Sequence, residues 1–159
     1  MAQEIERKFL IDKTRCPLPA TGVKMVQGYL LRTMELAIRL RLAGERAFLT
    51  IKGAQKNFTR SEYEYSIPAG DAEKMLSEFA DGKLVSKTRY FIPAGKHTWE
   101  VDIFEGNNAP LAVAEIELSR EDETFELPDW ITTEVTGDKR YNNTYLAEHP
   151  YNEWKNQEL

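Results

Sequence analysis

The sequence predicts a mainly β fold of the α+β class, in which eight antiparallel strands close into a barrel, or tunnel, with a charged lumen. Three observations lead to this prediction. Apolar and polar residues alternate in several runs, as in strands that have two different faces. The polar positions of these runs are mostly charged, and turn-forming residues separate the runs. Eight strands are enough to close a barrel around one small ligand.

The chain of 159 residues is long enough for one domain with a sizeable core. We expect a single tunnel domain over 1–159, with barrel strands within 3–119 and helices within 121–157. Gly44 and the sequence Pro93-Ala94-Gly95 mark tight turns, so the strands beside them should form antiparallel hairpins. The alternation predicts strands over about 3–12, 23–32, 35–43, 46–53, 59–67, 83–93, 96–105 and 112–119.

Helices are expected after the fifth strand and at the C-terminus. An amphipathic helix over about 71–81 is opened by Asp71 and closed by Gly82. Asp138 can cap a helix that runs to about Leu146, and a second short helix follows it. We expect the helices to pack outside the barrel, with a C-terminal helix near one end.

Each expected strand has one charged face and one apolar face. An open sheet with one face in water would also alternate. However, like-charged neighbours such as Glu115 and Glu117 repel each other unless opposite charges lie beside them, and an open sheet gives no reason to keep them. We therefore predict that the charged faces line the inside of a barrel. Together they carry eight acids and seven bases: Glu4, Glu6, Glu62, Glu64, Glu100, Asp102, Glu115, Glu117, Lys8, Arg39, Arg41, Lys52, Arg60, Lys87 and Arg89.

A lumen with so many ionised groups cannot be dry and empty, because each buried charge costs several kcal/mol unless it is paired, hydrated or bound to metal. Clustered carboxylates are typical ligands of hard divalent cations such as Mg²⁺ or Mn²⁺. Arginine and lysine bind phosphate oxygens, and arginine can do so with two hydrogen bonds. Both sets together predict a lumen that binds a metal–polyphosphate complex.

The composition argues against several other classes of function. The formal charge of −5 disfavours a general affinity for nucleic acid or anionic lipid. No apolar run approaches the ~20 residues needed to span a bilayer, and Glu4 and Glu6 do not fit a signal peptide. The single cysteine, Cys16, fits a reducing compartment. We expect a cytoplasmic protein without nucleic-acid or membrane partners, and both a monomer and a homodimer fit the sequence.

The charged motifs resemble those of the CYTH domain family, the triphosphate tunnel metalloenzymes, and in particular its short bacterial inorganic triphosphatase-like members. The resemblance covers residues 2 to about 147. It rests on the ExExK of Glu4, Glu6 and Lys8, followed by RxR at Arg39 and Arg41, TxKG around Lys52, ExE at Glu62 and Glu64, KxR at Lys87 and Arg89, ExD at Glu100 and Asp102, and ExE at Glu115 and Glu117.

The resemblance implies roles for these residues in the metal-dependent hydrolysis or rearrangement of triphosphates. Lys139, at the start of the C-terminal helix, resembles a substrate lysine on the helix that closes the tunnel, and an ordinary solvent-exposed lysine is the alternative. Glu62, Glu64 and Glu100 are further acids of the lumen. The implied metal ligands are Glu4, Glu6, Asp102, Glu115 and Glu117, and the implied phosphate-binding residues are Lys8, Arg39, Arg41, Lys52 and Arg89.

A catalytic base is expected on the second strand. Tyr29 lies two residues after Gln27, so both side chains lie on the same face of the strand, which we expect to face the lumen. There a cation such as Lys87 would favour the phenolate form of Tyr29. We hypothesise that Tyr29 and Lys87 form a dyad that positions or deprotonates the attacking water. Activity should then be highest at alkaline pH, because free tyrosine and lysine side chains titrate near ~10. Alternatively, Tyr29 only packs or hydrogen-bonds a phosphate.

The leading hypothesis is hydrolysis of inorganic tripolyphosphate to pyrophosphate and phosphate with Mg²⁺ or Mn²⁺, because this reaction needs only the lumen. A class IV adenylate cyclase and a thiamine or nucleoside triphosphatase are alternatives, and each needs a further site for an organic group. A binding module that holds polyphosphate without turnover is the non-enzymatic alternative. Simple anion capture, however, gains little from eight carboxylates.

Overall fold

The computed structural model describes residues 3–57 and 59–157, and over these residues it is built mainly from nine strands. The strands are β1 (Gln3–Ile11), β2 (Val23–Arg32), β3 (Leu36–Ala43), β4 (Arg46–Gly53), β5 (Thr59–Ile67), β6 (Val85–Ala94), β7 (His97–Phe104), β8 (Ala112–Glu117) and β9 (Ile131–Glu134). The α-helices are α1 (Ala69–Phe79) and α2 (Asn143–Glu148), and short 3-10 turns lie at Gly106–Asn108, Lys139–Tyr141, Tyr151–Glu153 and Lys155–Gln157. No helix in this part of the chain is both long and apolar enough to cross a membrane.

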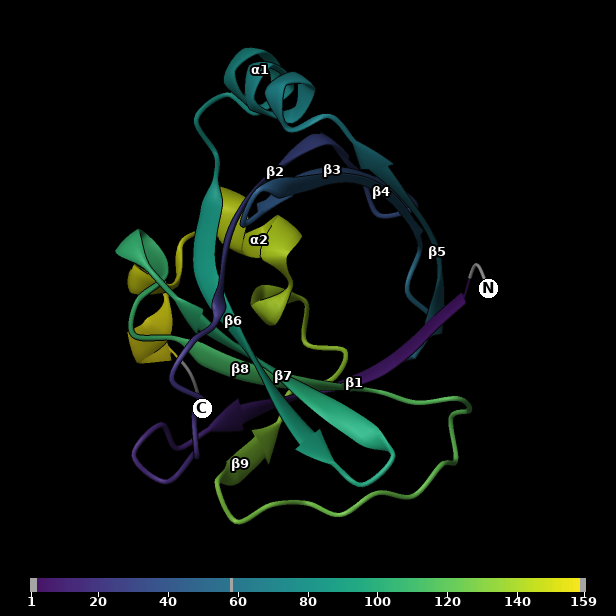
Figure 1. The fold of residues 1–159 in the computed structure, drawn as a ribbon, viewed down its shortest axis with the longest axis vertical. Coiled ribbons are helices and arrows are strands. Elements are labelled where there is room, and N and C mark those ends of the chain that lie inside the picture. The colour runs from purple at the N-terminus through teal and green to yellow at the C-terminus, as the bar shows by residue number, and fades with distance from the viewer. Residues whose placement is uncertain (1–2, 58, 158–159) are drawn as a thin grey trace.

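Eight of the strands form a closed antiparallel barrel (Figure 1). The order around the ring is β5-β4-β3-β2-β6-β7-β8-β1, and β1 pairs back onto β5. Closure requires β1 to pair along both of its edges. Residues 6–10 pair with β8 on one edge, and residues 3–5 pair with β5 on the other. β9 pairs with residues 9–11 of β1, along the edge of β1 that pairs with β5 at residues 3–5.

The pairing register brings charged positions of neighbouring strands onto one face. Lys8 of β1 lies opposite Glu115 of β8. Thr50 of β4 lies between Arg39 of β3 and Glu64 of β5. Because directly paired residues in neighbouring strands share a face, the charged face continues from strand to strand and lines the inside of the closed ring. The predicted barrel with a charged lumen is confirmed.

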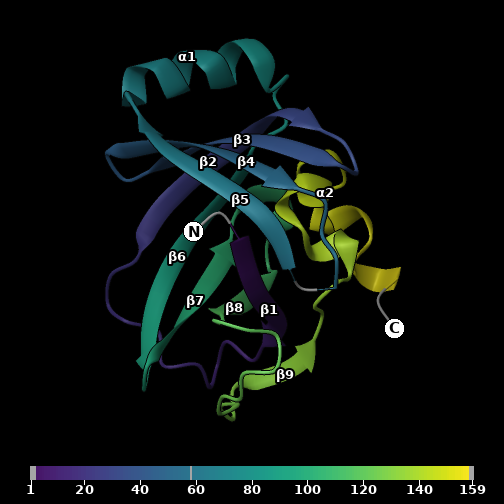
Figure 2. The ribbon, with the colours of Figure 1, turned by 90° about the vertical axis from the view of Figure 1, so that its right-hand side faces the viewer.

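Helix α1 covers the outside of β2, β3 and β4 (Figure 2). Leu76 of this helix and Ala80, its C-cap residue, pack on Leu40 of β3. The helix can come this close because β2 has a glycine at Gly28. An ideal Cβ at that position would lie 2.9 Å from the Ala80 Cβ and 2.9 Å from the Leu76 Cδ2.

The C-terminal part of the chain covers another side of the barrel and then one of its ends. Between β8 and β9, Phe125 and Trp130 pack edge-to-face against Trp99 on the outside of β7. After β9 the chain turns to the barrel end, where α2 and the following 3-10 turns lie across the opening (Figures 1 and 2). Tyr141 packs there against Trp154, with ring centroids 5.3 Å apart.

The bounds of the first helix differ from the prediction. α1 begins at Ala69 rather than at Asp71, because Pro68 occupies its N-cap and Asp71 lies in its first turn. Proline is tolerated at this place because its fixed φ matches the observed −62° and the residue before the helix donates no intrahelical hydrogen bond. The helix ends before Asp81 and Gly82, whose φ angles of 54° and 72° lie in the left-handed region.

The C-terminal region is less helical than predicted. β9 lies where only helices were expected, and it pairs with β1, a distant partner that local periodicity does not reveal. The helix expected from Asp138 to Leu146 is interrupted. Asp138 accepts a hydrogen bond from the Arg140 backbone N–H and caps a 3-10 turn, and the extended backbone of Asn142 separates this turn from α2. The second expected helix is present only as 3-10 turns.

Candidate active site in the barrel lumen

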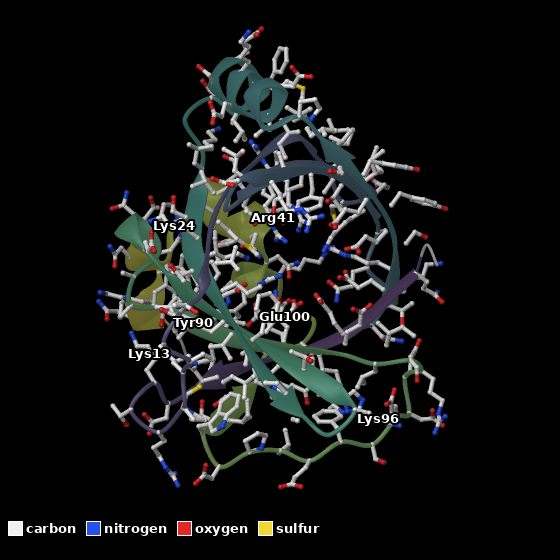
Figure 3. All side chains as sticks on the ribbon, viewed as in Figure 1. Lys13, Lys24, Arg41, Tyr90, Lys96 and Glu100 are labelled. Carbon is white, nitrogen blue, oxygen red and sulfur yellow. The ribbon has the colours of Figure 1, made fainter. Side chains whose placement is uncertain are left out.

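The lumen contains a cavity of about 260 Å³. Figure 3 shows Arg41 and Glu100 inside the ring of strands, whereas Lys13 and Lys96 lie outside it. The lining is predominantly charged and carries both signs. It consists of Glu4, Glu6, Glu62, Glu64, Glu100, Glu115, Glu117, Lys8, Arg39, Arg41, Lys52, Arg60 and Arg89, together with Tyr29, Ala37, Gln55, Val135, Thr136, Gly137, Asn142, Asn143 and Thr144.

Arg39 and Arg41 form a cationic part of the lining on β3. The Arg41 Nε donates to the Gln27 Oε1 at 2.9 Å. Arg39 donates from Nη2 to the Thr50 Oγ1 at 3.1 Å and lies 3.5 Å from Glu64, but its buried Nε has no partner among the described residues. Burial and the neighbouring arginines lower the pKa of Arg41 to about 9. Arg41 keeps its positive charge at neutral pH, and the unpartnered Nε of Arg39 can donate to an anion.

The acidic part of the lining lies on β1 and β8. Burial, together with repulsion from Glu115 and Glu4, raises the pKa of Glu6 well above its ordinary value. Burial and neighbouring acids, Glu4 first among them, also raise the pKa of Glu117. The Lys52 Nζ lies 3.2 Å from the Glu4 Oε1 and relieves only part of this repulsion. A cation bound between these carboxylates would relieve more of it.

Asp102 holds a cationic network in the wall behind the cavity. Arg89 donates to its Oδ1 at 2.7 Å and its Oδ2 at 2.9 Å, and the Lys87 Nζ lies 2.8 Å from Oδ2. Burial raises the pKa of Asp102, but these cations outweigh it and bring the pKa to about 2. Burial lowers the pKa of Lys87 to about 7, although Asp102 opposes the shift. Glu115 resembles Asp102: burial raises its pKa, but Lys8 and Arg89 lower it well below the ordinary value.

The C-terminal segment supplies neutral polar groups at one end of the cavity. Two buried lysines of the barrel bind this segment: the Lys8 Nζ donates to the Tyr141 backbone oxygen at 3.2 Å, and the Lys87 Nζ donates to the Asn143 Oδ1 at 3.1 Å. The residues that line this end were not predicted from the sequence, because they follow neither strand nor helix periodicity. The polar run Asn-Asn-Thr within an aromatic segment was the available signal. The lining residues at this end are Thr136, Asn142, Asn143 and Thr144.

Three predicted site residues do not line the cavity. Lys87 and Asp102 are buried in the wall, with exposed fractions of 0% and 2%. Lys139 is exposed to solvent and lies outside the lining. The structure brings together the other predicted residues, which are Tyr29, Lys8, Arg39, Arg41, Lys52, Arg89, Glu4, Glu6, Glu115, Glu117, Glu62, Glu64 and Glu100.

Tyr29 and Lys87 are bound to different partners. The Tyr29 hydroxyl accepts a hydrogen bond from the Gln27 Nε2 at 3.0 Å. Lys87 contacts Asp102 and Asn143 instead. Tyr29 lines the cavity, whereas Lys87 lies behind it and contacts one lining residue, Asn143.

The acidic part of the lining has the donor chemistry of a divalent-cation site, because carboxylate oxygens are the ligands that Mg²⁺ and Mn²⁺ prefer. Within residues 3–57 and 59–157, no three carboxylate, imidazole or thiol groups are already gathered as a set of metal ligands. Glu4 is instead paired with Lys52, and Glu115 with Lys8. These carboxylates would exchange a lysine for a metal ion. With that exchange, the residues present fit a hard divalent cation.

Comparison with known proteins finds relatives over nearly the whole chain. The sequence profile of the CYTH domain matches residues 2–148. An inorganic triphosphatase of Acetivibrio thermocellus is 41% identical over 155 residues, which cover 98% of this chain and 99% of that protein. An inorganic triphosphatase of Nitrosomonas europaea is 40% identical over 149 residues, which cover 91% of this chain and 96% of that protein.

Solved structures share the barrel. A crystal structure of an inorganic triphosphatase is 39% identical with a TM-score of 0.65, and the match covers 92% of this chain and 95% of that one. A putative adenylate cyclase from Bacillus halodurans is 16% identical with a TM-score of 0.59, and the match covers 76% of this chain and 84% of that one. The second similarity shows a common fold alone.

Proposed function

Because this chain belongs to the CYTH domain family, we propose that it is a divalent-metal-dependent triphosphatase that hydrolyses inorganic tripolyphosphate to pyrophosphate and phosphate. The observation that carries this proposal is a closed lumen in which arginine and lysine side chains share one cavity with carboxylates. The inorganic triphosphatases among its relatives support it.

The cationic lining would bind the phosphate groups. Phosphoryl transfer needs the negative charge of the transferred group to be neutralised, and preorganised cations provide this without reorganising during the reaction. Arg39 and Arg41 have free capacity for an anion, whereas the remaining cations would exchange a carboxylate partner for substrate. Lys139 would have to turn toward the opening from its exposed position. The proposed phosphate-binding residues are Lys8, Arg39, Arg41, Lys52, Arg89 and Lys139.

Family membership implies a divalent metal, and we propose Mg²⁺ or Mn²⁺ for this protein. Glu4, Glu6, Glu115 and Glu117 would hold it. A divalent cation supplies Lewis-acid polarisation of phosphate oxygens at such a site. Asp102, the fifth predicted ligand, would first have to give up the two hydrogen bonds from Arg89. We therefore propose that Asp102 chiefly holds Arg89 in place.

Tyr29 is the predicted catalytic residue that reaches the cavity. We propose that its hydroxyl orients the attacking water or a phosphate oxygen. Lys87 would assist as a buried charge behind the wall, where it also contacts the C-terminal segment through Asn143.

The lining of the cavity favours a substrate without an organic group. Among the lining residues that the structure describes, Tyr29 is the single aromatic one. The lining therefore offers a nucleobase or a thiamine ring little surface on which to stack.

A substrate panel tests the proposal. Phosphate release is measured from tripolyphosphate, ATP and thiamine triphosphate in the presence of Mg²⁺ or Mn²⁺, with analysis of all products. We expect tripolyphosphate to be hydrolysed fastest, to pyrophosphate and phosphate. Formation of cyclic AMP from ATP would indicate a cyclase instead, and tight binding of all three without release would indicate a binding module.

The proposal also places the enzyme in the cytoplasm. Its one cysteine, Cys16, is buried and has no second cysteine with which to pair. Burial raises the pKa of the Cys16 thiol to about 11, so the thiol is protonated and unreactive at neutral pH.

A further inference from the structure

Gln27 lies fully buried in the wall of the lumen, with an exposed fraction of 0%. It precedes Tyr29 by two residues on β2, so both side chains point to the same face, and it pairs directly with Arg41 on β3. Its amide contacts both of these residues. The Oε1 accepts from the Arg41 Nε at 2.9 Å, and the Nε2 donates to the Tyr29 hydroxyl at 3.0 Å. Gln27 therefore bridges two side chains that line the cavity.

The orientation of the Gln27 amide follows from the chemistry of Arg41. A guanidinium N–H group can only donate, so the amide oxygen must face Arg41 and the NH₂ group must face Tyr29. The Tyr29 oxygen consequently accepts this hydrogen bond, and the proton of the hydroxyl points away from Gln27. Because Tyr29 lines the cavity, that proton is available to an anion in the lumen.

Gln27 also holds Arg41 without forming an ion pair with it. Arg89 is paired with Asp102, and Arg39 lies 3.5 Å from Glu64. Within the part of the chain that the structure describes, Arg41 has no such ion pair, and its Nε is held by a neutral amide. A carboxylate at the same place would make the same hydrogen bond but would cancel much of the charge. In a buried wall, where screening by water is weak, that difference matters for a polyanionic ligand.

We propose that Gln27 is a positioning residue of the anion site, whose neutral amide holds Arg41 without neutralising it and turns the Tyr29 hydroxyl proton into the lumen. The proposal rests on the proposed triphosphatase function for the identity of the anion. It extends that function to a residue that does not touch the substrate.

Calorimetric binding of tripolyphosphate to the metal-free protein, with a chelator present, tests the charge effect. Gln27→Glu keeps an acceptor for Arg41, adds a negative charge, and cannot donate to the Tyr29 hydroxyl. We expect the affinity to fall roughly tenfold or more, the scale of one lost charge-assisted contact. With Mg²⁺ present, KM for tripolyphosphate should rise in parallel.

Asn108→Asp is the matched control. It makes the same amide-to-acid change at a buried position whose Oδ1 accepts from the Tyr151 backbone N–H, outside the cavity lining. We expect unchanged affinity and KM in this variant. An equal loss of affinity in Asn108→Asp and Gln27→Glu would overturn the proposal, because the loss would then reflect a buried acid in general.

Gln27→Met separates position from charge, since it removes both hydrogen bonds and stays neutral. The affinity of Gln27→Met for tripolyphosphate should fall less than that of Gln27→Glu. Its kcat should fall because the Tyr29 hydroxyl is no longer oriented. Combined with Arg41→Met, the loss of affinity should be smaller than the sum of the two single losses, because Gln27 acts partly through Arg41. Fully additive losses would contradict the proposal.

Circular dichroism and thermal unfolding establish that each variant is folded. If Gln27→Met is too unstable to measure, Gln27→Glu still tests the role of Gln27, because its carboxylate keeps an acceptor for Arg41. Wild-type affinity in folded Gln27→Glu would overturn the inference. A wild-type protein that binds tripolyphosphate but releases no phosphate would instead contradict the proposed function, and the binding data on Gln27 would still stand.

Discussion

Both carboxylate oxygens of Asp102 are bound at 2.7–2.9 Å by buried cations, Arg89 and Lys87. Asp102→Asn would leave these cations without their shared counterion. Removing one partner of a buried ion pair typically costs about 3–5 kcal/mol. We therefore expect a loss of about that size in the free energy of unfolding, measured by urea denaturation.

The control for this prediction is an exposed aspartate with one arginine partner. Asp129 lies 2.7 Å from Arg15, and both side chains are largely exposed. Asp129→Asn should change the free energy of unfolding by less than about 1 kcal/mol, because water screens such pairs. A similarly small change in Asp102→Asn would show that Asp102 does not anchor the wall.

Glu6 links metal binding to pH. A carboxyl group whose pKa is raised above 4.5 keeps its proton to higher pH, and a bound cation must displace that proton. The affinity of the metal-free protein for Mg²⁺ should therefore increase as the pH rises above 4.5 and through the raised pKa of Glu6. Calorimetry in buffers of different ionisation enthalpy should detect released protons, and fewer of them in Glu6→Gln. An affinity that does not vary with pH would contradict the assignment.

The sequence predicted which residues face the lumen, but not which of them reach the cavity. Strand parity places Asp102 and Lys87 on the same face as Glu115 and Glu6. Whether a side chain projects into the cavity or lies in the wall depends on its partners across the strands, and Asp102 is held back by Arg89 and Lys87. The same limit applies to the expected contact between Tyr29 and Lys87.

At the scale of elements, the strands in which charged and apolar residues alternate were predictable from the sequence. The structure of the C-terminal segment was not. The eight barrel strands have clear period-two patterns, and their predicted bounds lie close to the observed ones. β9 is only four residues long and is defined by its pairing with β1. The polar residues around Asn143 reach the cavity because Lys8 and Lys87 bind that segment, and such tertiary contacts leave no periodic signal.

The packing of α1 on the barrel depends on Gly28. A methyl group at this position would lie 2.9 Å from carbon atoms of both Leu76 and Ala80, so Gly28→Ala requires the helix to shift. We expect it to lower the free energy of unfolding by about 1–3 kcal/mol, as overpacking of a core usually does. Urea denaturation measures this change.

Gly70, in α1 itself, provides the matched control. An ideal Cβ there meets no atom within 4 Å. Gly70→Ala should leave the stability unchanged or raise it by up to about 1 kcal/mol, because alanine is less flexible than glycine in the unfolded chain. An equal stability loss in the two variants would mean that close helix packing is not what Gly28 permits.

At the scale of the whole molecule, barrel closure converts ordinary strands into a ligand site. No single strand of the sequence requires a lumen. The repetition of charged pairs predicted one, because so many ionised groups cannot be buried without partners. Closure through β1 and β5 brings Glu4 beside Arg60 and completes a ring in which acids and bases face one cavity.

Phosphate release from tripolyphosphate by the wild-type protein and by Glu117→Gln tests most directly the central claim that this charged lumen is a metal-dependent triphosphatase site. Glu117 lines the cavity, and its replacement removes a charge that the fold does not need. We predict Mg²⁺-dependent release by the wild type, its loss with a chelator, and a rate at least roughly a hundredfold lower in Glu117→Gln with unchanged thermal unfolding. Full activity in Glu117→Gln, or release by the wild type that does not depend on a divalent metal, would contradict the claim.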